Sequence, residues 1–321
     1  DNSGSMGDEQ ANLAANFQAM VAVLEEKDVD ANYRIGVTTS DNGNLWCTDT
    51  TPEAGRLQAS SCRDRLDSFV FDSGMELVDV SPQACLDICE HDGATLVIQP
   101  TTTDYDSNPT PRPWLERIEG KSNLPAGIST AAAFACLAPQ GIDGCGFESQ
   151  LESMYLALLR SGGDNEDSYG FLRRSAILAI IIVSDEVDCS ANPAWSEIFD
   201  PNGDKVFWSD PNTIGPSSAL CWNAGVVCDG DPSAYDCHAA DYDVSGQLTD
   251  DSDDAVLHPL ALHRSGRGPR GRQAELRRQP GGHRRADRRR RRGRLSQLLG
   301  RGRSGLPRRL RHRPGLRRRQ R

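Results

Sequence analysis

The chain has 321 residues, which is enough for one large domain or two ordinary ones. Its formal net charge is −10. The charge is split: residues 1–254 carry 12 basic and 44 acidic residues, whereas residues 255–321 carry 24 arginines and only two acidic residues. No stretch approaches the roughly 20 apolar residues of a membrane-spanning helix, so no transmembrane segment is predicted.

Apolar periodicity predicts the first elements in chain order. A helix is expected over residues 8–26 and a strand over 33–40. Residues 42–125 form a long cysteine-rich insertion, with short strands expected at 68–72 and 94–99.

The clearest strand pattern lies in the second half of residues 1–254. Helices are predicted at 128–137 and 147–159, and the continuous apolar run at 176–183 is typical of a parallel strand buried on both faces. Residues 190–254 are acidic and rich in loops. The alternation of helices and strands predicts an α/β domain with a mainly parallel sheet flanked by helices. The polar loops after 33–40 and 176–183 would then lie together, beyond the carboxyl ends of the strands.

All ten cysteines lie in the acidic part of the chain, in an even number and widely spread, which is typical of disulfides in an oxidising compartment. Zinc ligation needs closely spaced ligands, and the only tight pair is Cys85 and Cys89. Short loop lengths suggest the pairs Cys136–Cys145 and Cys228–Cys237, and the remaining pairing stays open. We therefore expect an extracellular, cell-surface or periplasmic protein with disulfides among Cys47, Cys62, Cys85, Cys89, Cys136, Cys145, Cys189, Cys221, Cys228 and Cys237.

The opening heptapeptide, Asp-Asn-Ser-Gly-Ser-Met-Gly, has the chemistry of a site for a hard cation. Asp1 offers a carboxylate, and Ser3 and Ser5 offer hydroxyls from alternate positions of one loop. Mg²⁺ prefers six oxygen ligands, of which one or two are carboxylates. The alternative interpretation is a turn and helix cap, for which serine and aspartate are also favoured.

This Asp-x-Ser-x-Ser-Met motif, followed by an amphipathic helix, resembles the metal-ion-dependent adhesion site of von Willebrand factor type A domains. The resemblance covers about residues 1–41 and 126–190, and points to large secreted or lipid-anchored bacterial members. It implies a second aspartate after the apolar strand, matched by Asp185. Where the family usually has a threonine, the stretch 140–146 has none, and Asp143 is the expected substitute.

The resemblance also implies a Rossmann-like sheet whose central strand ends at the first aspartate. That strand would precede Asp1, so the sequence is expected to be a fragment of a longer protein, with any lipid anchor in the missing part. The expected domain spans residues 1–254.

The function implied by the resemblance is binding and not catalysis. Asp1, Ser3, Ser5, Asp185 and Asp143 would hold Mg²⁺ or Ca²⁺, and a protein partner would offer a carboxylate to the ion. The alternatives are a metal-assisted hydrolase, a chelatase-type enzyme component, or a nucleic-acid binder that uses the arginine-rich end. The acidic body disfavours the last of these.

Residues 255–321 are predicted to be a disordered arginine-rich tail. From residue 260 onwards there is no Phe, Trp, Tyr, Ile, Val or Lys, so this stretch cannot form an apolar core. Arginine codons of GC-rich genes arise readily in a shifted reading frame, and a frame error near residues 258–263 is the preferred hypothesis. The coding DNA tests it.

Overall fold

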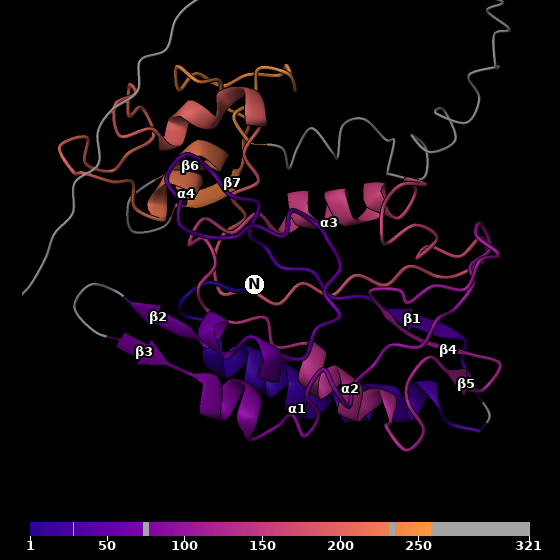
Figure 1. Cartoon of the computed structure of the whole chain (residues 1–321). Helices are drawn as coiled ribbons and strands as arrows, with labels where there is room; N and C mark the ends of the chain where they lie inside the picture. Colours follow the sequence, from indigo (N-terminus) through magenta and orange to yellow (C-terminus); the bar gives the residue numbers. More distant parts are fainter. Residues whose placement is uncertain (28, 73–76, 231–234, 258–321) are drawn as a thin grey trace, which may run out of the picture. The chain divides into compact units, whose positions relative to one another are not determined.

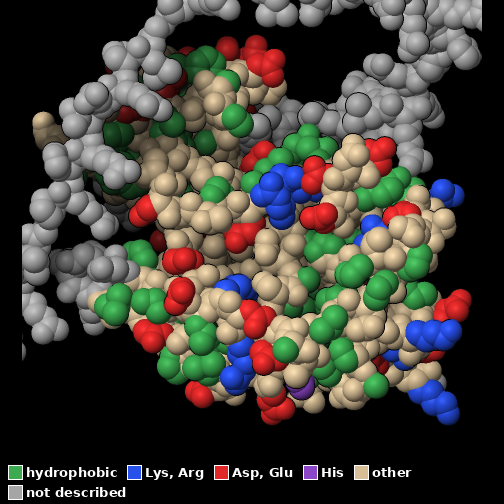
Figure 2. Space-filling model, in the orientation of Figure 1, with side chains coloured by type: hydrophobic (Ala, Val, Ile, Leu, Met, Phe, Trp, Pro, Cys, Tyr) green, Lys and Arg blue, Asp and Glu red, His purple; other side chains and the backbone are tan. Residues whose placement is uncertain are grey.

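The computed structural model describes residues 1–27, 29–72, 77–230 and 235–257 (Figure 1). The chain divides into two units, Asp1–Arg277 and Arg278–Arg321, and every described residue belongs to the first. The predicted arginine-rich tail lies outside the described residues from position 258 onwards. Acidic side chains are scattered over the face of the described part seen in Figure 2.

The N-terminal helix, α1 (Gly7–Leu24), confirms the helix predicted over 8–26. It buries Phe17 and Val21, which lie one turn apart on the same face. Phe17 stacks on Phe134 of α2 (Thr130–Leu137), with ring centroids 3.5 Å apart. The predicted helix at 128–137 is thus also present, and the two helices pack through these aromatic rings.

The sheets are short and antiparallel. The largest has three strands in the order β1-β4-β5 and pairs Arg34 with Glu116. Two hairpins, β2-β3 and β6-β7, complete the described strands. The strands are β1 (Tyr33–Ile35), β2 (Val70–Asp72), β3 (Leu77–Asp79), β4 (Leu115–Ile118), β5 (Lys121–Ser122), β6 (Val226–Asp229) and β7 (Asp236–Ala239).

The prediction of a mainly parallel, Rossmann-like sheet of the von Willebrand factor type A kind is therefore wrong. Of the expected strand at 33–40 only Tyr33–Ile35 is a strand, and it pairs antiparallel with β4 from the cysteine-rich insertion. The apolar run at 176–183 is not a strand, and residues 177–182 are all exposed. Residues 94–99 form no strand either, although Leu96 and Ile98 are buried. An apolar run in the sequence therefore does not by itself predict a strand, because a strand also needs a pairing partner from another part of the chain.

The remaining helical segments connect these parts. The helix α3 (Gln150–Arg160) matches the one predicted at 147–159. The short segments are η1 (Cys62–Asp64), η2 (Leu66–Phe69), η3 (Pro82–Leu86), η4 (Pro193–Phe199) and α4 (Ala219–Gly225). No helix among the described residues is long and apolar enough to cross a membrane.

Two hydrophobic clusters hold the described part together. The first is formed by α1, α2, β4 and the insertion, and contains Phe17, Val21, Phe69, Leu115, Phe134 and Ile142. The second is formed by segments from 145 to 257, and contains Phe147, Phe199, Trp208, Leu220 and Val256. Residues 255–257 are thus part of a buried core.

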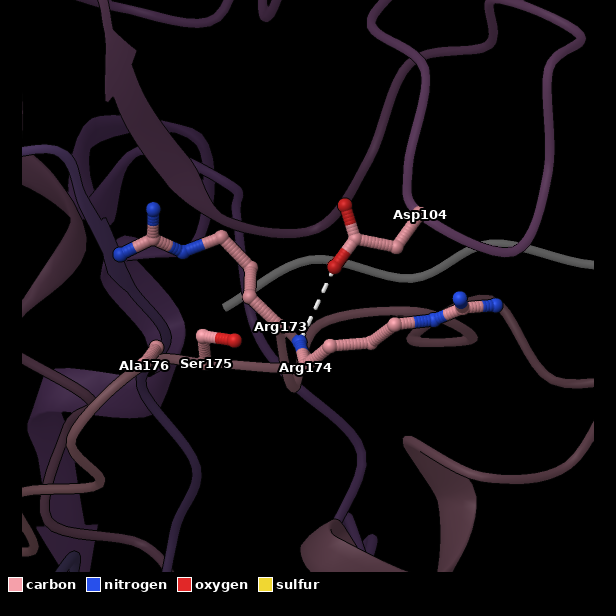
Figure 3. Close-up of a pocket in the computed structure, with 5 residues that line it drawn as sticks. All are labelled: Asp104, Arg173, Arg174, Ser175 and Ala176. Atoms are coloured by element: carbon pink, nitrogen blue, oxygen red, sulfur yellow. Dashed lines mark hydrogen bonds between the residues drawn. The ribbon is translucent and has the colours of Figure 1, made fainter.

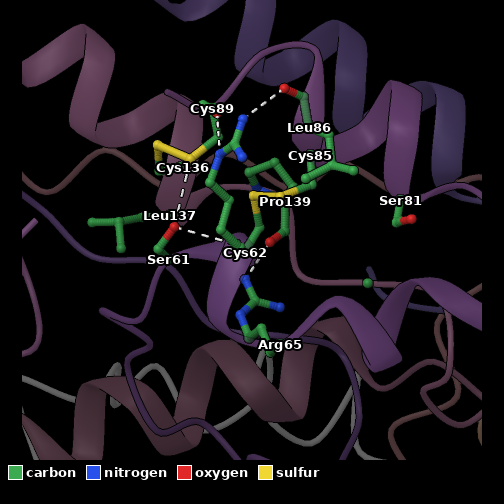
Figure 4. Close-up of a disulfide and its surroundings, with 12 residues drawn as sticks. Ser61, Cys62, Arg65, Ser81, Cys85, Leu86, Cys89, Cys136, Leu137 and Pro139 are labelled. Carbon is green, nitrogen blue, oxygen red and sulfur yellow. Dashed lines mark hydrogen bonds between the residues drawn. A yellow bond between two sulfur atoms is a disulfide. The ribbon is translucent and has the colours of Figure 1, made fainter. Parts of the chain in front are cut away.

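All ten cysteines are paired, which supports the prediction of an oxidising environment. The pair Cys228–Cys237 is confirmed. The pair Cys136–Cys145 is wrong, because Cys136 bonds Cys89 in the first cluster (Figure 4) and Cys145 bonds Cys47. The remaining pairs are Cys62–Cys85 and Cys189–Cys221. Short loop length is therefore a poor guide where the chain folds back on itself over long distances.

Candidate cation site

The carboxylate of Asp1 is held by three neighbours. Its Oδ1 accepts hydrogen bonds from the Ser3 backbone N–H at 2.9 Å and from the Ser40 hydroxyl at 3.4 Å. Its Oδ2 accepts a hydrogen bond from the Ser184 hydroxyl at 2.6 Å. The Asp1 amino group donates to the Val183 carbonyl at 3.2 Å. The opening loop therefore lies directly against the segment that follows the apolar run.

A second contact joins the same two segments. The Ser5 hydroxyl donates to Oδ1 of Asp185 at 3.1 Å, across 180 residues of sequence. Three of the residues predicted as cation ligands, Asp1, Ser5 and Asp185, are thus brought to one place.

Of the alternative interpretation, the turn is present, since residues 4–6 form a turn and the Met6 backbone N–H donates to the Ser3 carbonyl at 3.2 Å, but the helix cap is not supported. The residue that precedes α1 is Met6, and no side chain caps the helix. The Ser5 hydroxyl instead reaches Asp185.

The opening loop is positioned by Gln10, a buried residue in the first turns of α1. Its side-chain amide donates to the carbonyls of Asp1 and Gly141, each at 2.7 Å. Its Oε1 accepts from the backbone N–H groups of Gln140 at 2.7 Å and Gly141 at 3.0 Å. Gly141 has φ +100°, a conformation that favours glycine. One glutamine therefore ties the loop at 140–141 to the first residue of the motif.

Three buried oxygens at the site have no hydrogen-bond partner among the described residues: the Oδ1 of Asn2, the hydroxyl of Ser3 and the Oε1 of Glu148. Ser3 is 4% exposed and its hydroxyl is unpartnered. Glu148 is 2% exposed and its Oε1 is unpartnered. The Ser3 and Glu148 side chains are close enough for the serine hydroxyl to lower the pKa of the glutamate, but they do not reach hydrogen-bond geometry. Buried polar atoms are normally satisfied, so this pair needs an explanation.

The electrostatics of Glu148 are unusual. Burial raises its pKa to about 7, its own backbone and Ser3 lower it, and the negative charges of Glu186 and Asp185 raise it further. The Glu148 carboxyl is therefore within electrostatic reach of both Asp185 and Glu186. Bringing carboxylates together in a partly buried site is unfavourable unless a positive charge or a proton compensates them.

The structure does not bring Asp143 into this group. It is exposed, and its charge interacts with Arg65 and Asp41. In the described ranges no hydrogen bond joins it to Asp1, Ser5 or Asp185. Its neighbour Gly144 donates to the Asn2 carbonyl at 2.9 Å, so the loop that carries Asp143 runs beside the motif.

Sequence analysis missed Ser40, Ser184 and Glu148. Ser184 directly precedes Asp185, and Glu148 is the last residue of the Gly-Cys-Gly-Phe-Glu segment that the resemblance covers. Their positions in the sequence could therefore have identified both residues. Among the described residues, no group of three or more His, Cys, Asp or Glu side chains is arranged to hold a metal ion by itself. The predicted site takes part of its ligands from serine hydroxyls.

The buried carboxyl of Glu148 makes stability depend on pH. With a chelator present, its contribution to the free energy of unfolding is expected to be full below pH 4.5, its ordinary pKa, and to be lost as the pH rises through about 7. Glu148→Gln cannot ionise and should remove this loss, which amounts to about 2–3 kcal/mol. Urea unfolding between pH 4.5 and 8 measures it. Equal pH dependence in both proteins would contradict the expectation.

Comparison with protein-family models, with curated proteins and with solved structures finds no match to this chain.

Proposed function

We propose that the segments around Asp1 and Asp185 bind Mg²⁺ or Ca²⁺, and that the bound ion binds a carboxylate of a protein partner. Asp1, Ser3, Ser5 and Asp185 would hold the ion, as the resemblance to the adhesion site of von Willebrand factor type A domains implies. The proposal concerns the chemistry of the site and not the sheet architecture, which differs.

The observation that carries this proposal is the buried, unpartnered hydroxyl of Ser3, one of the proposed ligands, next to the Glu148 carboxyl, whose pKa the Asp185 charge raises. An unsatisfied buried polar atom costs about 1–3 kcal/mol, and a divalent ion would remove that cost. Carboxylate and hydroxyl oxygens are the ligands that hard cations prefer. The ion would also offset the repulsion of the Glu148 carboxyl by Asp185 and Glu186.

A site of this composition leaves part of the coordination sphere to other ligands. Mg²⁺ and Ca²⁺ take six or more oxygens and commonly complete their sphere with water or with a group from a bound molecule. The ion supplies a positive charge that attracts an acidic side chain. The residues of this chain orient the ion: Ser184 and Ser40 hold the Asp1 carboxylate, and Gln10 holds the loop.

Binding is favoured over the chelatase alternative. Five disulfides fit an oxidising environment, and a chelatase component would work in a reducing one. The nucleic-acid alternative rests on arginines that lie outside the described residues.

Isothermal titration with MgCl₂ and with CaCl₂ tests the cation site. The unaltered protein should bind at least one of the two ions, and Asp185→Asn should weaken that binding roughly tenfold or more. Asp204→Asn makes the same chemical change at an exposed position and should bind like the unaltered protein. Absence of heat in the unaltered protein, or equal binding by Asp185→Asn, would overturn the proposal.

A further inference from the structure

The apolar run at 176–183 contains a long exposed hydrophobic stretch outside the candidate site. Residues 177–182 are six consecutive exposed positions, and five of them are large apolar side chains. Ile177 is 96% exposed and Ile181 is 62% exposed. In the part of the chain that the structure describes, residues 177–182 pair with no strand.

Such a segment has the composition of a strand that lacks its partner. It contains neither glycine nor proline nor any charge, and four of its six residues are isoleucine, which is favoured in strands. Exposed backbone N–H and C=O groups together with apolar side chains form a template for pairing with another chain. A contiguous apolar surface of this kind marks an interaction site.

The two ends of the segment carry opposite charges. Arg173 and Arg174 precede it, and Asp185 and Glu186 follow it. The two arginines line an open hollow of about 450 Å³ together with Asp104, Ser175 and Ala176 (Figure 3).

The arginine end is held in place by the chain around it. The Arg174 backbone N–H donates to Asp104 at 3.0 Å, and its guanidinium lies over the ring of Tyr105. Arg173 donates to the Asn32 carbonyl. Figure 3 shows the two guanidinium groups extending to opposite sides of the backbone. This end therefore offers positive charge on both sides of an extended segment.

We propose that residues 177–182 pair antiparallel with the same segment of a second copy of this chain, with Ala179 of each copy opposite Ile180 of the other. This register places Arg173 opposite Glu186 and Arg174 opposite Asp185, while Ile177 meets Ile182 and Leu178 meets Ile181. A parallel arrangement would instead set arginine against arginine and carboxylate against carboxylate. Opposite charges across a strand pair stabilise it, and like charges destabilise it.

The second copy is the occupant because the segment is complementary to itself. Antiparallel pairing of identical segments is related by a two-fold axis, so the contact closes at two chains. It sets the apolar side chains of the two copies side by side, and each acidic end meets the arginines of the other. The pairing shares Asp185 with the proposed cation site but needs no bound ion, so it is expected in the presence of a chelator.

Sedimentation velocity over a range of protein concentrations, in a buffer with a chelator, tests the pairing. The unaltered protein should change from monomer to dimer as its concentration rises. Ile181→Lys should weaken dimerisation roughly tenfold or more, because each copy would place a charge against apolar side chains of the other. Ile214→Lys is the matched control: Ile214 is 90% exposed and lies outside the segment, so dimerisation should not change.

A charge exchange tests the register. Arg173→Glu and Glu186→Arg should each weaken the dimer, and the double variant should restore it, because the opposite charges then meet again. A monomer at every concentration would overturn the proposal. Growth beyond the dimer, equal weakening by Ile214→Lys, or no recovery in the double variant would overturn it as well.

Discussion

Replacing Cys47 and Cys145 together by serine is expected to lower the free energy of unfolding by about 3–4 kcal/mol, because the bond spans 98 residues, of which the intact bonds Cys62–Cys85 and Cys89–Cys136 already close 23 and 47. A long closed loop removes more conformational freedom from the unfolded chain than a short one. The bond also joins the insertion to the second hydrophobic cluster, where Cys145 is 1% exposed. Changing both residues avoids leaving an unpaired thiol.

Guanidinium unfolding of the double variant measures this loss. The matched control is the pair Cys228→Ser and Cys237→Ser, which opens a loop with a separation of only 9 residues. On loop length alone this control should lose about 2–3 kcal/mol. If both variants lose the same free energy, loop closure is not the main source of the stabilisation.

Glu116→Ala is expected to destabilise the protein by about 3–5 kcal/mol, because it leaves a buried arginine without its counter-charge. Glu116 of β4 pairs with Arg34 of β1, and their side chains are 7% and 6% exposed. The Trp114 indole N–H also donates to this carboxylate at 3.4 Å. The Arg34 guanidinium donates to the Gly170 carbonyl at 2.6 Å, which neutralises none of its charge.

Thermal and urea unfolding measure the effect, with Glu166→Ala as the control. Glu166 pairs with Arg160 at 2.7 Å, but its side chain is 38% exposed, so this loss should stay below about 1 kcal/mol. A second variant, Arg34→Met with Glu116→Leu, removes both charges and should recover most of the stability lost by Glu116→Ala. Losses of similar size in Glu116→Ala and Glu166→Ala would show that burial of the pair is unimportant.

The sheet is where sequence analysis failed most clearly. β1 pairs with β4, which lies about 80 residues further along the chain, and no local pattern in residues 33–40 indicates that partner. The apolar run at 176–183 was interpreted as a buried parallel strand, yet Ile177 is almost fully exposed. Strand pairing is a contact between distant segments, so a pattern within one segment cannot choose its partner.

Sequence analysis of the candidate site succeeded for some residues and failed for another. The motif at residues 1–7 and the aspartate after the apolar run singled out Asp1, Ser5 and Asp185, and in the structure Asp1 bonds Ser184 while Ser5 bonds the adjacent Asp185. Their role as cation ligands stays a prediction. Asp143 was chosen by its place in the sequence, and its exposed side chain interacts with Arg65 and Asp41 instead.

From the sequence alone came the helices α1, α2 and α3, the disulfide-bonded state of the cysteines and the segments of the candidate site. These follow from periodicity over a few turns, from composition and from a short motif, all of which are local properties. Only the tertiary structure decided the antiparallel sheets, four of the five disulfide pairs and the burial of Ser3 and Glu148. Each of these depends on which distant segments meet, and that choice is made by the packing of the whole chain.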